Sequence, residues 1–355
     1  MSEQANNTSQ NNNQKVPTLW GWHTWLSIAI TVVILLCLAA MLDLREIWRE
    51  VAASDKKLLL LGALAHYATY PVRGLRWRRC LIHLPLKAGA GKFGVLVFFY
   101  NFVDNVVPAK LGDVYGAHLA RINCGIRRSA AMGSLVFLRV VDAWVLLLLA
   151  SVASWILFSS RLLPSVFWSL IGGGIIAVIA TSLMLTLFLF KKSLPGWLPE
   201  KVHQMIHAFH TGMWPRPSEI VPIVILTAII WVLETSWILL LTLAFGLTPS
   251  AAEVVFLTMI PLLASAFPFT PSGAGVVEVT LFSCLRLIGV AAPTAVSVTV
   301  ANRFIDYWLH IGLGLVTWAI RRSLGLRTWR EVPIEDFQQV AGAETSLNQK
   351  VFHEG

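Results

Sequence analysis

Residues 254–290 read VVFLTMIPLLASAFPFTPSGAGVVEVTLFSCLRLIGV, and this stretch decides the fold. Two apolar arms, Val254–Phe269 and Val276–Val290, flank a centre that is rich in Pro and Gly. Each arm is shorter than the roughly 20 residues that cross a bilayer as one helix, and no basic loop separates them. Broken backbone at membrane depth is tolerated only where protein or a watery cavity surrounds it. The stretch therefore predicts a re-entrant helical hairpin.

The composition of the whole chain is that of a membrane protein. Of its 355 residues, 56% are hydrophobic and only 13% are charged, whereas soluble domains carry about 25% charged residues. A water-soluble enzyme, a disordered chain and a disulfide-stapled secreted module are thereby excluded. The net charge is +9. Because the basic residues stand beside apolar runs and no basic domain lies outside them, we expect no nucleic-acid partner.

Long apolar runs predict about six full transmembrane helices beside the hairpin, at residues 22–42, 58–72, 130–159, 166–190, 220–247 and 293–320. Residues 93–128, broken at Pro108 and Gly112, predict a second re-entrant hairpin. Basic clusters at 73–92 and 321–330 mark cytoplasmic loops. They predict a multi-pass protein of the inner (cytoplasmic) membrane with both termini in the cytoplasm.

The predicted fold class is an all-α polytopic membrane protein with a single transmembrane domain at residues 20–325. Residues 1–19 are rich in Asn, Gln and Ser and predict a disordered polar tail. Residues 326–355 are expected to form a cytoplasmic C-terminal tail.

Two parts of the domain repeat the same order of features. Pro108-Ala-Lys-Leu-Gly-Asp113 precedes Arg139-Val-Val-Asp142, and Pro271-Ser-Gly-Ala-Gly-Val-Val-Glu278 precedes Arg303-Phe-Ile-Asp306. The acid and the following Arg are 26 residues apart in repeat one (about 93–160) and 25 apart in repeat two (about 254–322). By the charge rule the two hairpins enter from opposite sides. This predicts an inverted-topology repeat, which in many secondary transporters holds a site between the repeats.

The same motifs resemble the transmembrane domain of the lysylphosphatidylglycerol synthase/flippase family. The most specific part is Pro268-Phe-Thr-Pro-Ser-Gly-Ala-Gly-Val-Val-Glu278, and the resemblance covers roughly residues 25–322. It implies a flippase domain without the soluble aminoacyl-transfer domain, since about 35 residues follow the last span. The chain departs from the family pattern at Ser272 (often Gly), Asp113 (usually Glu) and Gly116 (usually Arg). These departures predict a different mode of ligand binding in the first repeat.

Charged residues inside apolar runs are the site candidates, because a charge at the bilayer centre costs at least ~2.5–3.5 kcal/mol. Arg139 and Arg303 offer a planar fork to a lipid phosphate. Asp142 and Asp306, three residues later on the same helical face, would hold the Arg or exchange a proton. The alternative for each Arg-x-x-Asp motif is a self-neutralising pair that locks two helices.

The remaining acids have the same two interpretations. Asp113 and Glu278 either form a cap or a salt bridge to the Arg of their repeat, or serve as protonatable carboxylates for proton coupling. Glu234 is near the centre of its span, and we expect it to have a function or to pair with Arg286 or Arg303.

The hairpin turns complete the expected headgroup-binding set. Gly273 and Gly275 allow tight turns, and helix N-termini there would offer free N–H groups to an anion; the alternative is close helix packing. Lys110 either contacts the headgroup or lies in a solvated mouth. Ser272 is assigned to the same set, with an intramembrane serine nucleophile as the alternative.

These features predict a lipid translocator that moves an anionic, modified or polyprenyl-phosphate-linked lipid headgroup between leaflets. Two alternatives remain. One is an integral membrane glycosyl or lipid-headgroup transferase, and the other is a non-transporting partner of a cell-envelope synthesis enzyme. The chain has no Asp-x-Asp pair and no other catalytic motif, so we expect no enzyme activity, metal or cofactor.

Overall fold

The computed structural model describes residues 44–106, 112–158, 164–189, 199–265 and 275–327, and every regular element in these ranges is a helix. The predicted all-α polytopic class is confirmed. The predicted span 22–42, the tail 1–19 and residues 328–355 lie outside the described residues. The packed domain extends through Arg327, because Leu326 is buried and the Arg327 N–H donates to Asn123 Oδ1.

Three helices in the described part of the chain are long and apolar enough to cross a membrane: Arg128–Phe158, Val166–Thr186 and Pro217–Ala244. They are α6 (Arg128–Phe158), most of α7 (Pro164–Leu189) and α9 (Pro217–Ala244). Their outer faces expose large apolar side chains such as Trp155 and Trp168, which is typical of a surface that meets lipid. The predicted spans 130–159, 166–190 and 220–247 are confirmed as helices.

Helix α3 (Lys56–Cys80) contains the predicted span 58–72 and continues beyond it. Asp55 begins the helix by accepting hydrogen bonds from the N–H groups of Lys57 and Leu58. The prediction that a cytoplasmic loop begins at Arg73 is wrong, because the chain stays helical to Cys80 and Arg76 is buried. The charge rule assigns arginines to loops and takes no account of an acidic partner inside the protein.

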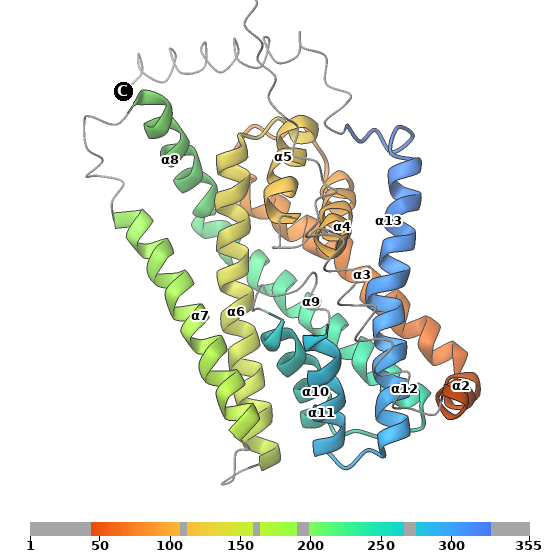
Figure 1. Cartoon of the computed structure of the whole chain (residues 1–355). Coiled ribbons are helices and arrows are strands. Elements are labelled where there is room, and N and C mark those ends of the chain that lie inside the picture. The colour runs from red at the N-terminus through yellow and green to blue at the C-terminus, as the bar shows by residue number, and fades with distance from the viewer. Residues whose placement is uncertain (1–43, 107–111, 159–163, 190–198, 266–274, 328–355) are drawn as a thin grey trace, which may run out of the picture.

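A broken pair of helices stands at each predicted hairpin. The first pair is α4 (Ala90–Val106) and α5 (Gly112–Cys124), and the second is α10 (Ala251–Ala264) and α11 (Val276–Leu287). The members of each pair pack against one another. The pairs lie toward opposite ends of the bundle (Figure 1), as an inverted repeat requires.

The predicted span 293–320 is one continuous helical stretch with an irregular centre. It comprises α12 (Ala292–Arg303), a π-helical segment η4 (Phe304–Leu309) and α13 (His310–Ala319). π-Helical turns are rare and are frequent at functional sites. Here the π turn contains Asp306, one of the predicted site residues.

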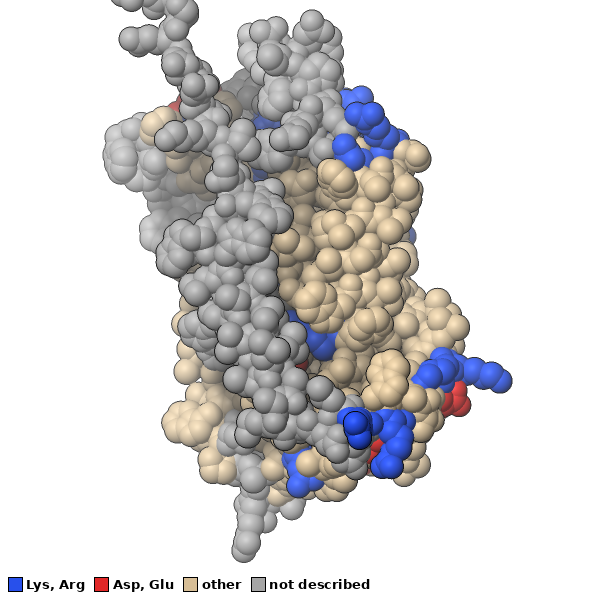
Figure 2. Space-filling model, turned by 45° about the vertical axis from the view of Figure 1, so that its right-hand side comes forward, with Lys and Arg blue, Asp and Glu red and all other residues tan. Residues whose placement is uncertain are grey.

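Helices α3 and α9 run antiparallel at the centre of the bundle and pack along one another (Figure 1). The hairpin α4–α5 packs against α3, and α10 packs against α9 and α6. Two short helices complete the described fold: α2 (Leu44–Ala53) contacts α12, and α8 (Glu200–Met213) contacts α6. On the face drawn in Figure 2, Lys and Arg side chains gather mainly at the two ends, and the broad band between them is mostly tan, with a small charged spot beside the grey atoms. This distribution fits a protein that spans a bilayer.

Candidate functional site

The polar face of α3 is the centre of the site. His66, Arg73 and Arg76 follow one another at intervals of seven and three residues, so that they share one side of the helix. That side faces α9, α4 and α6. The charge rule assigns Arg73 and Arg76 to a loop. Their spacing from His66, which fits the 3.6-residue period of a helix, indicates instead that α3 continues through them.

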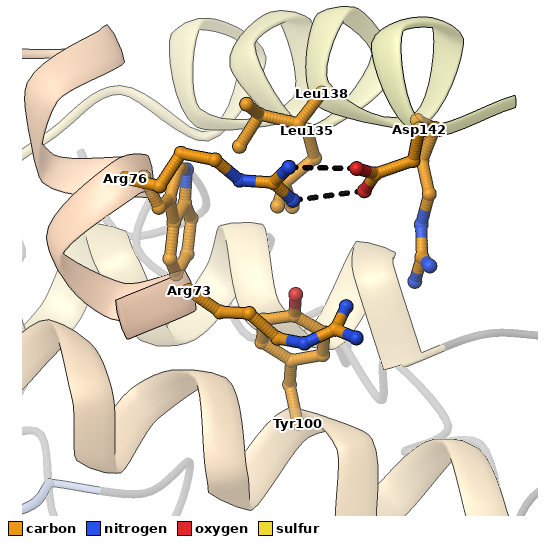
Figure 3. Close-up of a pocket in the computed structure, with 8 residues that line it drawn as sticks. Arg73, Arg76, Tyr100, Leu135, Leu138 and Asp142 are labelled. Carbon is orange, nitrogen blue, oxygen red and sulfur yellow. Dashed lines mark hydrogen bonds and ion pairs between the residues drawn. The ribbon is translucent and has the colours of Figure 1, made fainter. Parts of the chain in front are cut away.

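Arg76 and Asp142 of α6 form a buried, two-pronged ion pair. Arg76 Nη1 lies 2.6 Å from Asp142 Oδ1, and Nη2 lies 2.8 Å from Oδ2. Nη1 also donates to the hydroxyl of Thr227 on α9 at 3.0 Å. Both partners are almost fully buried, at 3% and 8% exposure. Figure 3 shows the guanidinium facing the carboxylate edge to edge, the geometry that favours Arg over Lys.

Glu234 of α9 lies between two basic groups of α3. Its Oε1 accepts from Arg73 Nη2 at 2.8 Å, and its Oε2 is 3.3 Å from His66 Nδ1. The predicted pairing of Glu234 with Arg286 or Arg303 is therefore wrong. Arg286 instead donates to the carbonyl of Val290 at the end of its own helix. The prediction failed because the charge pattern does not show that α3 packs against α9.

Asp306 extends the network from the other side of His66. Its Oδ1 lies 3.4 Å from His66 Nε2, so that both ring nitrogens of His66 face carboxylates. The Asp306 side chain is 38% exposed, whereas the Glu234 side chain is 12% exposed. The network thus runs from an accessible acid to a buried one through a histidine.

In both repeats the hairpin acid pairs with the Arg of the following helix. Asp113 accepts from Arg139 Nε and Nη2 at 3.0 and 2.9 Å, and Glu278 Oε1 lies 2.7 Å from Arg303 Nε. The salt-bridge interpretation of these acids is confirmed. The self-neutralising Arg-x-x-Asp pair is wrong in both repeats, because the two Asp residues face α3.

The second helix of each hairpin begins at a glycine whose N–H meets a carboxylate. The N–H of Gly275, at φ 84°, donates to Glu278 Oε2 at 2.7 Å. The N–H of Gly112 donates to Asp104 Oδ1 at 3.0 Å. Each bond occupies one of the N–H groups that the N-terminus of its helix would otherwise offer to an anion. Three predicted site residues lie outside the described residues: Lys110, Ser272 and Gly273.

The register of the contacts supports a two-fold relation between the halves. Arg73 precedes the first residue of α4 by 17 positions, and Glu234 precedes the first residue of α10 by the same number. Their ion pair thus joins equivalent positions of α3 and α9. The same offset relates His66 to Thr227 and Arg76 to Trp237. We infer that each repeat includes the long helix before its hairpin.

Three arginines line a small cavity beside the contact between α3 and α9 (Figure 3). It is lined by Arg73, Arg76, Arg139, Asp142 and Tyr100, with Trp77, Leu135 and Leu138. Its volume is about 20 Å³, which is room for about one water molecule. The Arg139 side chain is half exposed. An anion larger than water would therefore enter only after these helices separate.

The described residues hold no group of three or more His, Cys, Asp or Glu side chains arranged for a metal ion. The site consists of charge-assisted hydrogen bonds, most of them buried. Side chains of these types can bind an anion or exchange a proton, and buried charges are usually functional or fix one arrangement of helices.

Residues 24–314 match the family model described as the lysylphosphatidylglycerol synthase TM region. The chain belongs to this family. A UPF0104 membrane protein of Methanothermobacter thermautotrophicus is 23% identical over 322 residues, which cover 81% of this chain and 90% of the relative. A second UPF0104 membrane protein, from Methanocaldococcus jannaschii, is 26% identical over 62% of this chain and 94% of its own length.

A third similar protein is the glycosyltransferase AglD of Haloferax volcanii. It is 26% identical over 125 residues, which are 35% of this chain. The match spans only 20% of the glycosyltransferase. The family and these relatives make this chain an integral, multi-pass membrane protein.

Proposed function

We propose that this protein translocates a lipid with an anionic headgroup between the leaflets, and that Arg139 is the first group to meet the lipid phosphate. The observation that carries the proposal is the position of the arginine cavity. It is lined by α3, α4 and α6, two of its arginines bind side chains of α9 in the other half, and its third arginine is half exposed. A planar guanidinium forms two parallel hydrogen bonds with phosphate oxygens.

The ion pairs support a mechanism in which acids and lipid compete for the same arginines. Asp113 holds Arg139 and Asp142 holds Arg76 while the cavity is closed. A headgroup phosphate would replace these carboxylates, and rocking of one repeat against the other would expose the cavity to alternate sides. In this mechanism the Arg303–Glu278 pair holds the second repeat, Glu234 holds Arg73, and Asp306 exchanges the coupled proton.

A liposome assay tests the proposal. The full chain is reconstituted into phosphatidylcholine vesicles that contain a trace of fluorescent phosphatidylglycerol, and dithionite quenching reports the lipid that reaches the outer leaflet. We expect quenching beyond one leaflet with the wild type and at least about tenfold slower transfer with Arg139→Gln. The matched control is Arg216→Gln, an exposed arginine before α9. Equal rates with Arg139→Gln and the control would contradict the proposal.

A glycosyltransferase role, or the role of membrane partner to such an enzyme, is the second candidate, favoured by the match to AglD. The same vesicles distinguish it. Supplied with a polyprenyl phosphate and a radiolabelled nucleotide sugar, an enzyme would make a labelled lipid, and a pure translocator would not. Stable co-purification of an envelope-synthesis enzyme without lipid transfer would identify the partner role.

We further propose an inner-membrane location with both termini in the cytoplasm. The support is the basic cluster that follows α13, which contains Arg321, Arg322 and Arg327. A C-terminal green fluorescent protein fusion should fluoresce, and an alkaline phosphatase fusion at the same residue should be inactive. The opposite pair of results would invert the topology.

A further inference from the structure

Each arginine that lines the cavity is held by an acid, and the three acids differ in one respect. Arg76 is held by Asp142, Arg139 by Asp113 and Arg73 by Glu234. Glu234 alone among these acids also faces a histidine, since its Oε2 lies 3.3 Å from His66 Nδ1. Arg73 can therefore leave Glu234 while Glu234 keeps a positively charged partner, provided that His66 is protonated.

His66 is placed to carry that charge. It is 6% exposed, and its two ring nitrogens face Glu234 and Asp306. The other titratable groups around it are Arg73, Tyr67 and Tyr70 of α3 and His310 of α13. From the packed neighbours, α4 contributes the ring of Phe98 to the tyrosines and His310, and Asp142 of α6 is held by Arg76.

Building on the proposed function, we propose that proton uptake by His66 is coupled to the binding of a lipid phosphate at Arg73. While His66 is neutral, Glu234 keeps Arg73 as its positively charged partner. When His66 holds a proton on each ring nitrogen, it donates to both Glu234 and Asp306. Glu234 then retains a cation, and Arg73 turns to the phosphate in the cavity that it lines.

The charge balance of the buried site favours this coupling. A phosphodiester brings one negative charge into a region where an uncompensated charge is costly, and the proton on His66 brings one positive charge with it. The proton arrives through Asp306, the accessible acid, and passes from its carboxyl to His66 Nε2. Asp306 is left ionised and accepts the new N–H.

The experiment measures binding of dioctanoyl-phosphatidylglycerol to the full chain in phosphatidylcholine nanodiscs by calorimetry, from about pH 5.5 to about pH 8, the range in which histidine titrates. We expect the affinity to fall with rising pH by up to about tenfold per unit, the limit for one linked proton. Buffers with different heats of ionisation should report the uptake of one proton per lipid.

Two variants and a control separate the steps. His66→Gln should bind weakly at every pH. Glu234→Gln, in which Arg73 is no longer held, should bind at the high pH as tightly as the wild type does at the low pH. His83→Gln should keep the wild-type slope, because His83 follows α3 and contacts the carbonyl of Thr211.

The outcomes distinguish the coupling from the proposed function. A flat pH profile in the wild type, or an unchanged slope in His66→Gln, overturns the coupling while lipid transfer by the wild type still supports the translocator. Binding that Arg73→Gln leaves at full strength also overturns the coupling. Absence of both binding and transfer at every pH overturns the translocator, and the coupling with it.

Discussion

The two repeats place the hairpin acid, the Arg and the Asp alike, but the Asp of each repeat meets a different side chain of α3. In the first repeat, Asp142 is held by the permanently charged Arg76 through two short bonds, and the half-exposed Arg139 pairs with Asp113. In the second, Asp306 is held by His66 at 3.4 Å, and Arg303 is 7% exposed beside Glu278. The Tyr307 ring also lies 4.2 Å from the Arg303 guanidinium carbon.

This difference suits separate tasks for Asp142 and Asp306, which occupy equivalent positions of the two repeats. A fixed pair with an accessible arginine suits the capture of an anion, whereas a histidine between two acids suits the uptake of a proton. In the proposed translocator the inverted repeat would give two access routes, and the different side chains would let one half bind the lipid and the other half take up the proton. The predictions below test whether the halves differ in this way.

The largest expected difference is between Asp142→Asn and Asp306→Asn. Asp142→Asn leaves the Arg76 guanidinium buried without a countercharge, which costs about 3–5 kcal/mol. Asp306→Asn should cost about 1 kcal/mol or less, because Asp306 is partly exposed and His66 can lose its proton. Denaturant unfolding in detergent micelles measures both. Equal losses would remove the distinction between a fixed and a titratable pair.

The second prediction concerns how closely each hairpin approaches its long helix. A Cβ at Gly74 of α3 would lie 2.2 Å from the backbone nitrogen of Gly94 on α4, while the equivalent position of α9 is Thr235. Gly74→Ala should therefore destabilise the protein by about 3 kcal/mol through overpacking. The matched control is Gly174→Ala, where the nearest atom is 3.7 Å away. Its stability should not fall, and a similar loss in both variants would contradict the close contact.

The third prediction separates the two repeat arginines. Arg139→Gln should fold normally and lose lipid transfer, because its side chain is half exposed and Asp113 can be solvated. Arg303→Gln should lose folded protein, because it leaves Glu278 buried without a cation. Size-exclusion profiles of the two variants, measured beside transfer rates, give the comparison. A folded, inactive Arg303→Gln would show that both arginines contact the ligand.

The sequence predicted the parts of this protein that depend on local pattern. Long apolar runs identified α6, α7 and α9, and Pro and Gly between short runs identified both hairpins. The hairpin acids could be matched to the repeat arginines because both lie within one repeat. Ion-pair partners that belong to different repeats could not be predicted. Glu234 and Arg73 are far apart in the chain and meet only because α3 packs against α9.

The error at Arg73 and Arg76 has the same origin. The positive-inside rule reads a run of arginines as a loop, whereas Arg78 and Arg79 form the last turn of α3. Arg76, two residues before Arg78, lies on the side of α3 that faces Asp142 and is part of the core. The signal that distinguishes them is helical phase: Arg76 lies ten residues after His66 and on its face.

The smallest expected effect is at the start of the second helix of each hairpin. Gly275 has φ 84°, a conformation that costs an L-residue with a side chain about 1–2 kcal/mol. Gly275→Ala should thus lower the free energy of unfolding by about 1 kcal/mol, and Gly275→Asn by as much, since ψ is −47° at Gly275 and the region that Asn tolerates lies at positive ψ. At Gly112 the obstacle is different: a Cβ would lie 2.6 Å from the Asp104 Cβ. Gly112→Ala and Gly112→Asn should therefore both be poorly tolerated. If Asn were clearly better than Ala at Gly275, its turn would be an ordinary left-handed one. If Ala were accepted at Gly112, the close contact with Asp104 would be contradicted.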